Sequence, residues 1–284
     1  MIQIIGAGLA GCIIASRYKD AIIYERDRIG GLCRDNKHYQ EYVHIVHTDN
    51  QEVYDFFKAN TTVRDYRIEF LSYVDGQYKD WYPREITPEV IDKQIKGYSK
   101  KMWQGEIPPE AEIRLRTSPD KYFFHNKFEF IPDFTLLFKN LLKNADIYFE
   151  RIKDGDIDGK IILTGPIDEY FDYVYGKLPY RGIQATHIET EIRLQADCIN
   201  IPDETIPFTR LVDYHRLGFE GNWIGIETPS KDDHYPIRNS ESEQVFEKYR
   251  QLAEKKGIIL LGRQATFHYM DVDQVVEQAL NIEI

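Results

Sequence analysis

Three glycines near the N-terminus have the residue type and the spacing that phosphate binding requires. Gly6, Gly8 and Gly11 form the pattern Gly-x-Gly-x-x-Gly, directly after a short apolar run. In such a pattern the first glycine permits a tight turn, the second lets the backbone approach a pyrophosphate, and the third lets a helix pack on a strand. A helix N-terminus then stabilises the phosphate charge. The spacing therefore predicts a dinucleotide-binding turn.

The residues that follow indicate which dinucleotide is bound. Glu25 ends an expected strand, where its carboxylate can hold the ribose hydroxyls of an adenosine. Arg26 comes next, and Gly30-Gly31 supplies a second glycine pair near the diphosphate. This extended pattern resembles that of flavoproteins, whereas NAD enzymes usually lack the second pair. The sequence therefore favours FAD, contacted by Glu25, Arg26, Gly30 and Gly31.

A strand–helix–strand unit must position these residues. Apolar runs predict buried parallel strands at Met1–Ile5 and Ala21–Glu25, with a helix at Leu9–Tyr18 between them. Asp75-Gly76 predicts a hairpin turn. Further helices are expected at Asn50–Lys58, Thr87–Gln104, Pro132–Asn144, Ser240–Lys256 and Met270–Asn281, and further strands at Ile68–Tyr82, Asp146–Phe149, Lys160–Leu163, Ile188–Leu194, Thr205–Val212 and Ile258–Leu261.

The order of these elements predicts the fold class. Alternating α/β signals lie at both ends of the chain, and helices and antiparallel strands lie between them. We expect an α/β protein with a discontinuous Rossmann-like FAD-binding domain, an inserted helical region and an antiparallel β-sheet substrate domain.

Composition limits the partners and the compartment. The formal net charge of −11 argues against a nucleic-acid partner and disfavours anionic membranes. Three cysteines without metal-ligand spacing argue against a disulfide scaffold and against a metal site. No basic segment precedes the first apolar run, and no stretch is long enough to span a membrane. We expect a cytoplasmic protein with neither a nucleic-acid nor a membrane partner.

The most specific motif is Thr164-Gly165-Pro166-Ile167-Asp168-Glu169-Tyr170-Phe171-Asp172-Tyr173, closely followed by Leu178-Pro179-Tyr180-Arg181. It resembles the UDP-galactopyranose mutase family. Further blocks similar to that family follow in the same order: His44-Ile45-Val46-His47-Thr48, Lys96-Gly97-Tyr98 with Trp103, Pro207-Phe208-Thr209-Arg210, His234-Tyr235-Pro236, Gly262-Arg263 and Tyr269-Met270-Asp271. The resemblance runs from residue 1 to about residue 280.

This resemblance implies a flavin-dependent reaction without net oxidation. Reduced FAD would attack the anomeric carbon through N5 and expel UDP, and the sugar ring would open and reclose at another hydroxyl. The implied substrate is a UDP-sugar, either UDP-galactopyranose, giving UDP-galactofuranose, or a related sugar such as UDP-arabinopyranose.

Roles carried over by position are likewise implied by the resemblance. Arg210 would grip the diphosphate, and Arg114 would be the second arginine on a mobile loop, with Arg116 as its rival. His44 and His47 would pack beside the isoalloxazine. Gly262, Arg263 and Asp271 would hold the flavin region. The implied substrate-binding residues are Tyr98, Trp103, Tyr122, Arg181, Tyr235 and Tyr269.

The chain departs from the family in its helical region, which is shorter than in bacterial members. We expect the FAD-binding domain at 1–50, 126–165 and 246–284, the helical region with the mobile loop at 85–125, and the substrate sheet at 67–84 and 166–245. Because the shortened region carries a subunit contact in bacterial members, a monomer and a homodimer both stay open. Two alternatives to a mutase also stay open: an FAD-dependent oxidoreductase of the amine-oxidase-like fold, and a UDP-sugar or flavin-binding protein without turnover.

Overall fold

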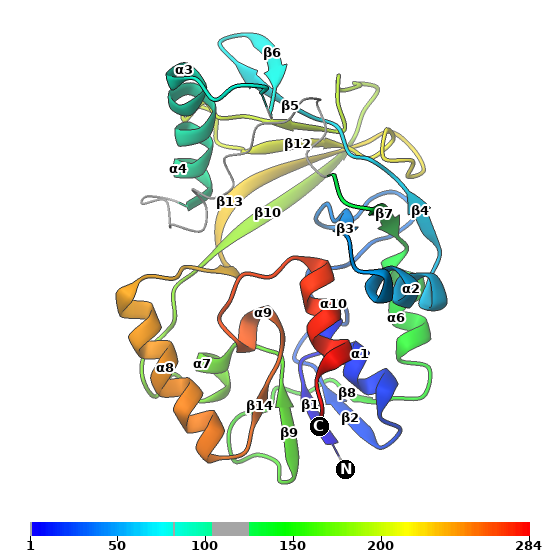
Figure 1. The fold of residues 1–284 in the computed structure, drawn as a ribbon, viewed down its shortest axis with the longest axis vertical. Helices are drawn as coiled ribbons and strands as arrows, with labels where there is room; N and C mark the ends of the chain where they lie inside the picture. Colours follow the sequence, from blue (N-terminus) through cyan, green and yellow to red (C-terminus); the bar gives the residue numbers. More distant parts are fainter. Residues whose placement is uncertain (1, 82, 104–124) are drawn as a thin grey trace.

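The computed structural model describes residues 2–81, 83–103 and 125–284. A parallel sheet and an antiparallel sheet lie at opposite ends of the long axis, and a small sheet lies between them (Figure 1). This arrangement confirms the predicted α/β class with a Rossmann-like body and an antiparallel sheet.

The parallel sheet has the order β14-β9-β1-β2-β8, and each neighbouring pair is parallel. Its strands come from three separate parts of the chain, as expected for a discontinuous body. Because the strands are parallel, their carboxyl ends meet at one edge, next to the glycine turn. The strands are β1 Ile2–Ile5, β2 Ala21–Tyr24, β8 Asp146–Tyr148, β9 Lys160–Leu163 and β14 Ile259–Leu260.

Helices cover both faces of this sheet, so its strands are apolar on both sides. Ile4 and Ile162 belong to the core on one face, whereas Ile5 and Leu163 belong to the core on the other. Helices α1 Leu9–Arg17, α6 Phe134–Leu141 and α10 Val272–Asn281 build the first core, and α7 Ile167–Tyr170 and α8 Ser240–Lys255 build the second.

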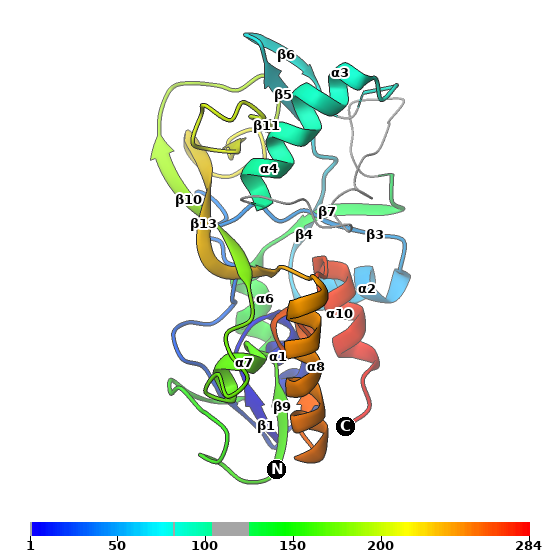
Figure 2. The same ribbon diagram turned by 90° about the vertical axis from the view of Figure 1, so that its left-hand side faces the viewer.

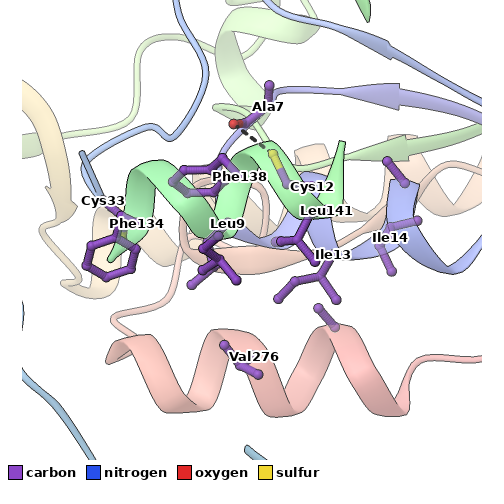
Figure 3. Packing of buried hydrophobic residues seen from close by; sticks show 14 of the residues in the cluster. Ala7, Leu9, Cys12, Ile13, Ile14, Cys33, Phe134, Phe138, Leu141 and Val276 are labelled. Carbon is purple, nitrogen blue, oxygen red and sulfur yellow. Dashed lines mark hydrogen bonds between the residues drawn. The ribbon is translucent and has the colours of Figure 1, made fainter. Parts of the chain in front are cut away.

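The close packing around α1 fixes the helix that follows the glycine turn. Figure 3 shows Leu9 and Ile13 of α1 between Phe134 of α6 and Val276 of α10. Cys12 faces back toward the turn, and its Sγ donates to the backbone oxygen of Ala7 at 3.2 Å. The N-terminus of α1 is therefore held rigidly at the edge of the sheet.

The second sheet has the order β10-β13-β12-β11-β5-β6 and is antiparallel except between β11 and β5. The predicted hairpin turn is confirmed, because Asp75 and Gly76 both have positive φ, at 51° and 79°. The strands are β5 Phe70–Val74, β6 Gln77–Asp80, β10 Tyr180–Glu189, β11 Cys198–Asn200, β12 Arg210–Asp213 and β13 Trp223–Pro236.

Two predicted strands of this sheet were misplaced. The segment predicted at Ile188–Leu194 leaves the sheet after Glu189, and the strand predicted at Thr205–Val212 begins only at Arg210. The side chain of Asp203 explains the second error, since it accepts hydrogen bonds from the backbone nitrogen of Thr205 at 2.8 Å and from its hydroxyl at 2.7 Å. This local turn competes with strand formation.

The helix predicted at Thr87–Gln104 is confirmed as far as the described residues extend. It consists of α3 Pro88–Val90, the π-helical turn η1 Ile91–Lys96 and α4 Gly97–Trp103, and it stands against the second sheet (Figures 1 and 2). A Cβ on Gly97 would lie 2.5 Å from the backbone oxygen of Pro202. The glycine therefore allows close contact between α4 and the loop before β12.

The small antiparallel sheet connects the two ends of the molecule. It has the order β3-β7-β4, and α10 packs against β3. Its strands are β3 Val46–Thr48, β4 Val63–Asp65 and β7 Phe128–Pro132, and the remaining helices are α2 Gln51–Asn60 and α9 Gly262–Ala265.

Candidate functional site

The glycine turn between β1 and α1 has the geometry that its spacing predicts. Gly6 has φ of 107°, a conformation that favours glycine. A Cβ on Gly11 would lie 2.1 Å from the backbone oxygen of Gly6, so the helix can approach the strand only without a side chain. A Cβ on Gly8, in contrast, would meet no atom within 4 Å, because Gly8 faces a cavity.

The second glycine pair lies against this turn. The backbone nitrogen of Gly30 donates to the oxygen of Ala7 at 2.8 Å. Glu25 joins the same structure, since its carboxylate accepts from the backbone nitrogens of Ala7 at 2.8 Å and Asp27 at 2.9 Å. Residues distant in sequence thus form one cradle with backbone donors and a fixed carboxylate.

This cradle lines a cavity of about 760 Å³ at the carboxyl edge of the parallel sheet. Such a volume is in the range of cofactor sites. The predicted cofactor residues that line it are Gly6, Gly8, Glu25, Arg26, Gly30, Gly31, Gly262 and Arg263. Gly11 packs beneath the turn instead, and Asp271 lines a neighbouring cavity.

Arg26 lies at the rim of the first cavity. It forms an ion pair with Glu169, which also pairs with Arg151 at 3.1 Å, and the side chain of Arg26 is 51% exposed. The guanidinium of Arg26 therefore faces solvent on one side. Sequence reasoning missed Glu169 as its partner, because the two residues are far apart in the chain.

A second cavity, of about 330 Å³, opens between the small sheet, α4 and the antiparallel sheet. His44 and Arg263 line both cavities, so the two are adjacent. All the substrate residues predicted from the sequence that fall in the described part of the chain line the second one: Tyr98, Trp103, Arg181, Tyr235 and Tyr269. His47, Arg210 and Asp271 line it too.

Stacking on aromatic rings holds two arginines of this cavity. The guanidinium carbon of Arg181 lies 3.8 Å from the ring centroid of Trp103 and 4.3 Å from that of Tyr235. Arg263 lies 5.0 Å from the ring of Tyr235 and 5.2 Å from that of Tyr269. Stacked guanidiniums direct their N–H donors sideways, which suits an anionic ligand.

Polar contacts hold Arg210, the third arginine of this cavity. Its Nε donates to Oδ1 of Asn200 at 3.0 Å, its Nη2 donates to the Tyr98 hydroxyl at 2.9 Å, and its Nη1 lies 3.3 Å from a carboxylate oxygen of Glu227. Burial raises the pKa of Glu227, while the charge of Arg210 and a hydrogen bond from the backbone of Val43 act in the opposite direction. Three arginines of the described residues thus line this cavity, in a protein of net negative charge.

His44 lies where the two cavities meet. Burial lowers the pKa of its imidazole to about 4, although a contact of 2.8 Å between Nδ1 and the backbone oxygen of Tyr42 opposes this. His44 is therefore neutral at pH 7. In that state, the contact with the carbonyl requires the proton on Nδ1.

Two carboxyl groups at the start of α10 also line the second cavity. Asp271 accepts a hydrogen bond from the Tyr269 hydroxyl at 2.8 Å. Burial, together with the nearby Asp271, raises the pKa of Asp273 to about 6, and a hydrogen bond with Thr48 is among the contacts that lower it. Sequence reasoning identified Asp271 but missed Asp273.

Three predicted residues lie outside the described part of the chain, namely Arg114, its rival Arg116, and Tyr122. Sequence reasoning also missed Asn200 and Glu227, the partners of Arg210. Strand pairing is the signal that could have identified them, because both residues pair directly with Arg210 across the sheet.

Within 2–81, 83–103 and 125–284, no three His, Cys, Asp or Glu side chains are grouped as a metal site would need. In the same ranges, no helix has both the length and the apolar character required to cross a membrane.

Comparison with protein families identifies the wider group. A family model described as UDP-galactopyranose mutase matches residues 93–269. A dTDP-fucopyranose mutase of Escherichia coli is 27% identical, with 98% of this chain and 96% of the relative covered. A probable UDP-galactopyranose mutase of Klebsiella pneumoniae is 26% identical, with 98% and 92% covered.

Comparison of folds agrees with the sequence match. A crystal structure of reduced UDP-galactopyranose mutase matches with a TM-score of 0.73 at 14% identity, covering 98% of this chain and 92% of that one. A putrescine oxidase variant matches with a TM-score of 0.53 at 12% identity, covering 98% and 96%. The fold is therefore shared by isomerases and oxidases.

Proposed function

The chain belongs to the UDP-galactopyranose mutase family, and we propose that it interconverts the pyranose and furanose forms of a nucleotide-diphosphate sugar, with FAD in its reduced form. Family membership identifies an isomerase with the flavoprotein fold. The substrate, the redox state of the flavin and the residue roles belong to the proposal.

The observation that carries this proposal is the adjacency of two unlike cavities. The first has the glycine cradle and Glu25, which fit the diphosphate and adenosine ribose of FAD. In the second, three arginines of the described residues lie among aromatic rings. The arginines fit the diphosphate of a nucleotide smaller than FAD, and the rings fit its base. His44 and Arg263 lie at the junction, where a flavin ring and a sugar would meet.

The fit of the cofactor can be judged from the protein alone. The open face of Gly8 leaves room for phosphate oxygens, and Glu25 is already oriented by two backbone donors. In its reduced form, the bound flavin would supply a nucleophile at N5. The task of the chain is to bind both molecules, orient them and neutralise the nucleotide as it departs.

We assign the residues of the second cavity accordingly. Arg210 binds the diphosphate next to the leaving oxygen, where negative charge develops. Tyr98 and Trp103 contact the base and the ribose. Arg181 and the stacked pair Tyr235 and Tyr269 surround the phosphates; the ring centroids of this pair are 5.8 Å apart. The neutral His44 packs beside the flavin ring without adding charge, and His47 lies next to it.

Three nucleotide sugars are candidate substrates. UDP-galactopyranose, UDP-arabinopyranose and dTDP-fucopyranose differ in the base, in the ribose 2′-hydroxyl and in the outer carbon of the sugar. Loss of one CH₂OH contact changes the preference by about 1–3 kcal/mol. We expect UDP-arabinopyranose to rival UDP-galactopyranose, and a hexose preference above roughly a thousandfold would contradict this expectation. A relative named dTDP-fucopyranose mutase makes that sugar the third compound to test.

Product analysis tests the function directly. The purified holoenzyme is incubated anaerobically with each of the three pyranoses plus dithionite, and the products are separated by chromatography. We expect a furanose product only with reduced flavin and without stoichiometric consumption of reductant. Equal turnover with oxidised flavin would refute the role of reduced flavin. Substrate-dependent hydrogen peroxide would instead support the oxidoreductase alternative.

A further inference from the structure

A single rung of the antiparallel sheet holds Arg210. Asn200 of β11 pairs with Arg210 of β12, which pairs with Glu227 of β13. Directly paired residues on neighbouring strands point to the same face of a sheet. The three side chains therefore lie in a row, and Tyr98 of α4 completes the set from above the sheet.

In this row the carboxylate of Glu227 is buried, and removing a charge from water costs free energy. Glu227 is 3% exposed and Asn200 is fully buried. A buried ion pair contributes little or nothing to stability compared with apolar residues of the same size, because desolvation offsets the attraction. The stability of the sheet alone thus gives no reason for a glutamate at this position.

A second buried carboxylate, directly before β11 of the same sheet, provides a contrast. Asp197 is 2% exposed, pairs with Arg216 at 3.1 Å and accepts from the backbone nitrogen of Glu69 at 2.8 Å. Neither Asp197 nor Arg216 lines the second cavity. Glu227 differs because the guanidinium it holds belongs to that cavity.

We propose that Glu227 is a positioning residue with two effects: it aims the Arg210 guanidinium into the second cavity, and its negative charge weakens the equilibrium binding of the nucleotide diphosphate there. This inference rests on the proposed function, since it takes that ligand to be a nucleotide diphosphate. Asn200 also accepts a hydrogen bond from Arg210 but carries no charge, so Arg210 lies between one charged and one neutral acceptor.

The reaction gives a physical reason for weakening the binding of the nucleotide in this way. The diphosphate is present in the substrate, in the separated nucleotide and in the product, and it must finally leave. Binding that is equally strong in all these states does not accelerate the chemical step. A carboxylate behind Arg210 reduces this uniform attraction, while the fixed guanidinium still meets the charge that develops on the departing oxygen.

Two substitutions, each of which replaces a residue by one of nearly the same size, change the negative charge beside Arg210 in opposite directions. Glu227→Gln removes one negative charge, and Asn200→Asp adds one on the other side of the same guanidinium. The latter loses no hydrogen bond, because Nδ2 of Asn200 has no partner among the described residues. The oxidised, FAD-loaded proteins are titrated with UDP and with dTDP by calorimetry, so that no turnover is needed.

We expect Glu227→Gln to bind the nucleotide roughly tenfold more tightly and Asn200→Asp to bind it weaker by a similar factor, the scale for one charge near a partly desolvated ligand. Turnover of Glu227→Gln should fall, with a lower KM, because release slows. Glu227→Asp, which keeps the charge but shortens the side chain, should lose turnover without gaining affinity.

Asp197→Asn is the matched control, because it removes a similarly buried carboxylate that lies next to the same sheet but does not line the cavity. It should lower thermal stability and leave nucleotide affinity unchanged. Unchanged or weaker binding by Glu227→Gln would overturn the inference and leave Glu227 with a structural role only. Failure of the wild-type protein to bind either nucleotide would overturn this inference and the nucleotide-sugar substrate together, whereas nucleotide binding without a furanose product would count against the proposed function alone.

Discussion

The two adjacent cavities are built from different parts of the chain. Glycines and backbone donors form the cradle of the first, where the missing Cβ of Gly8 leaves room for a ligand. Side chains form the second, where arginines are held by stacking on aromatic rings or by a row of polar partners. The first site therefore depends on the shape of the backbone, while the second depends on the direction and charge of individual side chains.

This difference predicts how each cavity responds to substitution. A Cβ added at a glycine of the first cavity cannot move away, because the backbone and the helix packing fix its position. We therefore expect such a substitution to have a large effect on folding or on ligand binding. A side-chain contact can be weakened in steps.

The largest effect is expected at Gly11. In Gly11→Ala the new Cβ would lie 2.1 Å from the backbone oxygen of Gly6, so we expect a destabilisation of more than about 4 kcal/mol and little folded protein. In Gly8→Ala the Cβ meets no protein atom within 4 Å, so we expect a melting temperature near that of the wild type but at least tenfold less bound FAD. Melting curves and flavin absorbance check both. Normal FAD content in Gly8→Ala would place the pyrophosphate elsewhere.

The next largest effect is expected at Arg210. Arg210→Ala should lower turnover by roughly 10²–10³, the scale for removal of a donor aimed at developing charge. Arg210→Lys should recover little, because a point charge cannot replace the planar fork. Arg216→Ala is the control, since Arg216 lies in the turn after β12 and pairs with the buried Asp197 but does not line the cavity. Near-normal furanose formation by Arg210→Ala would show that Arg210 is not the diphosphate ligand.

A smaller, graded effect is expected at Tyr98. Its hydroxyl accepts from Nη2 of Arg210 at 2.9 Å, and its ring contacts Trp81 edge-on with centroids 4.8 Å apart. Tyr98→Phe removes only the hydroxyl, so kcat/KM should fall by about 5–10-fold, as for one hydrogen bond. Tyr98→Ala should cost more, because the ring contact is lost as well. Equal loss in both variants would contradict a separate role for the hydroxyl.

The smallest effect concerns Asp273 and stability. Its folded-state pKa of about 6 lies above the ordinary value of 3.8, so the folded protein holds this proton more tightly than the unfolded chain does. The resulting stabilisation is present at low pH and is lost as the pH rises through about 6. Asn remains neutral, and the melting temperature of Asp273→Asn relative to wild type should therefore increase between pH 4 and pH 7. A constant difference over that range would contradict the assignment.

The glycine cradle of the first cavity could be predicted from sequence to a large extent. Gly6, Gly8 and Glu25 lie within one βαβ unit, so local spacing nearly determines their arrangement. The second cavity could not be derived from the sequence in this way. Tyr98 and Arg210 are 112 positions apart and meet only because α4 packs on the sheet. The resemblance to a family identified such residues, but it gave no partner for Arg210.

Sequence pattern alone was enough to predict the glycine turn and the parallel sheet, and the resemblance supplied the family and the candidate residues that line the two cavities. Only the tertiary structure decided that Glu227 and Asn200 flank Arg210, that Asp273 lies in the second cavity and that the strand at Arg210 begins after an Asp203 turn. The difference arises from the distance along the chain over which the interactions act. Backbone conformation depends on neighbours in the chain, whereas charge pairing and burial depend on which distant strands come together in the folded protein.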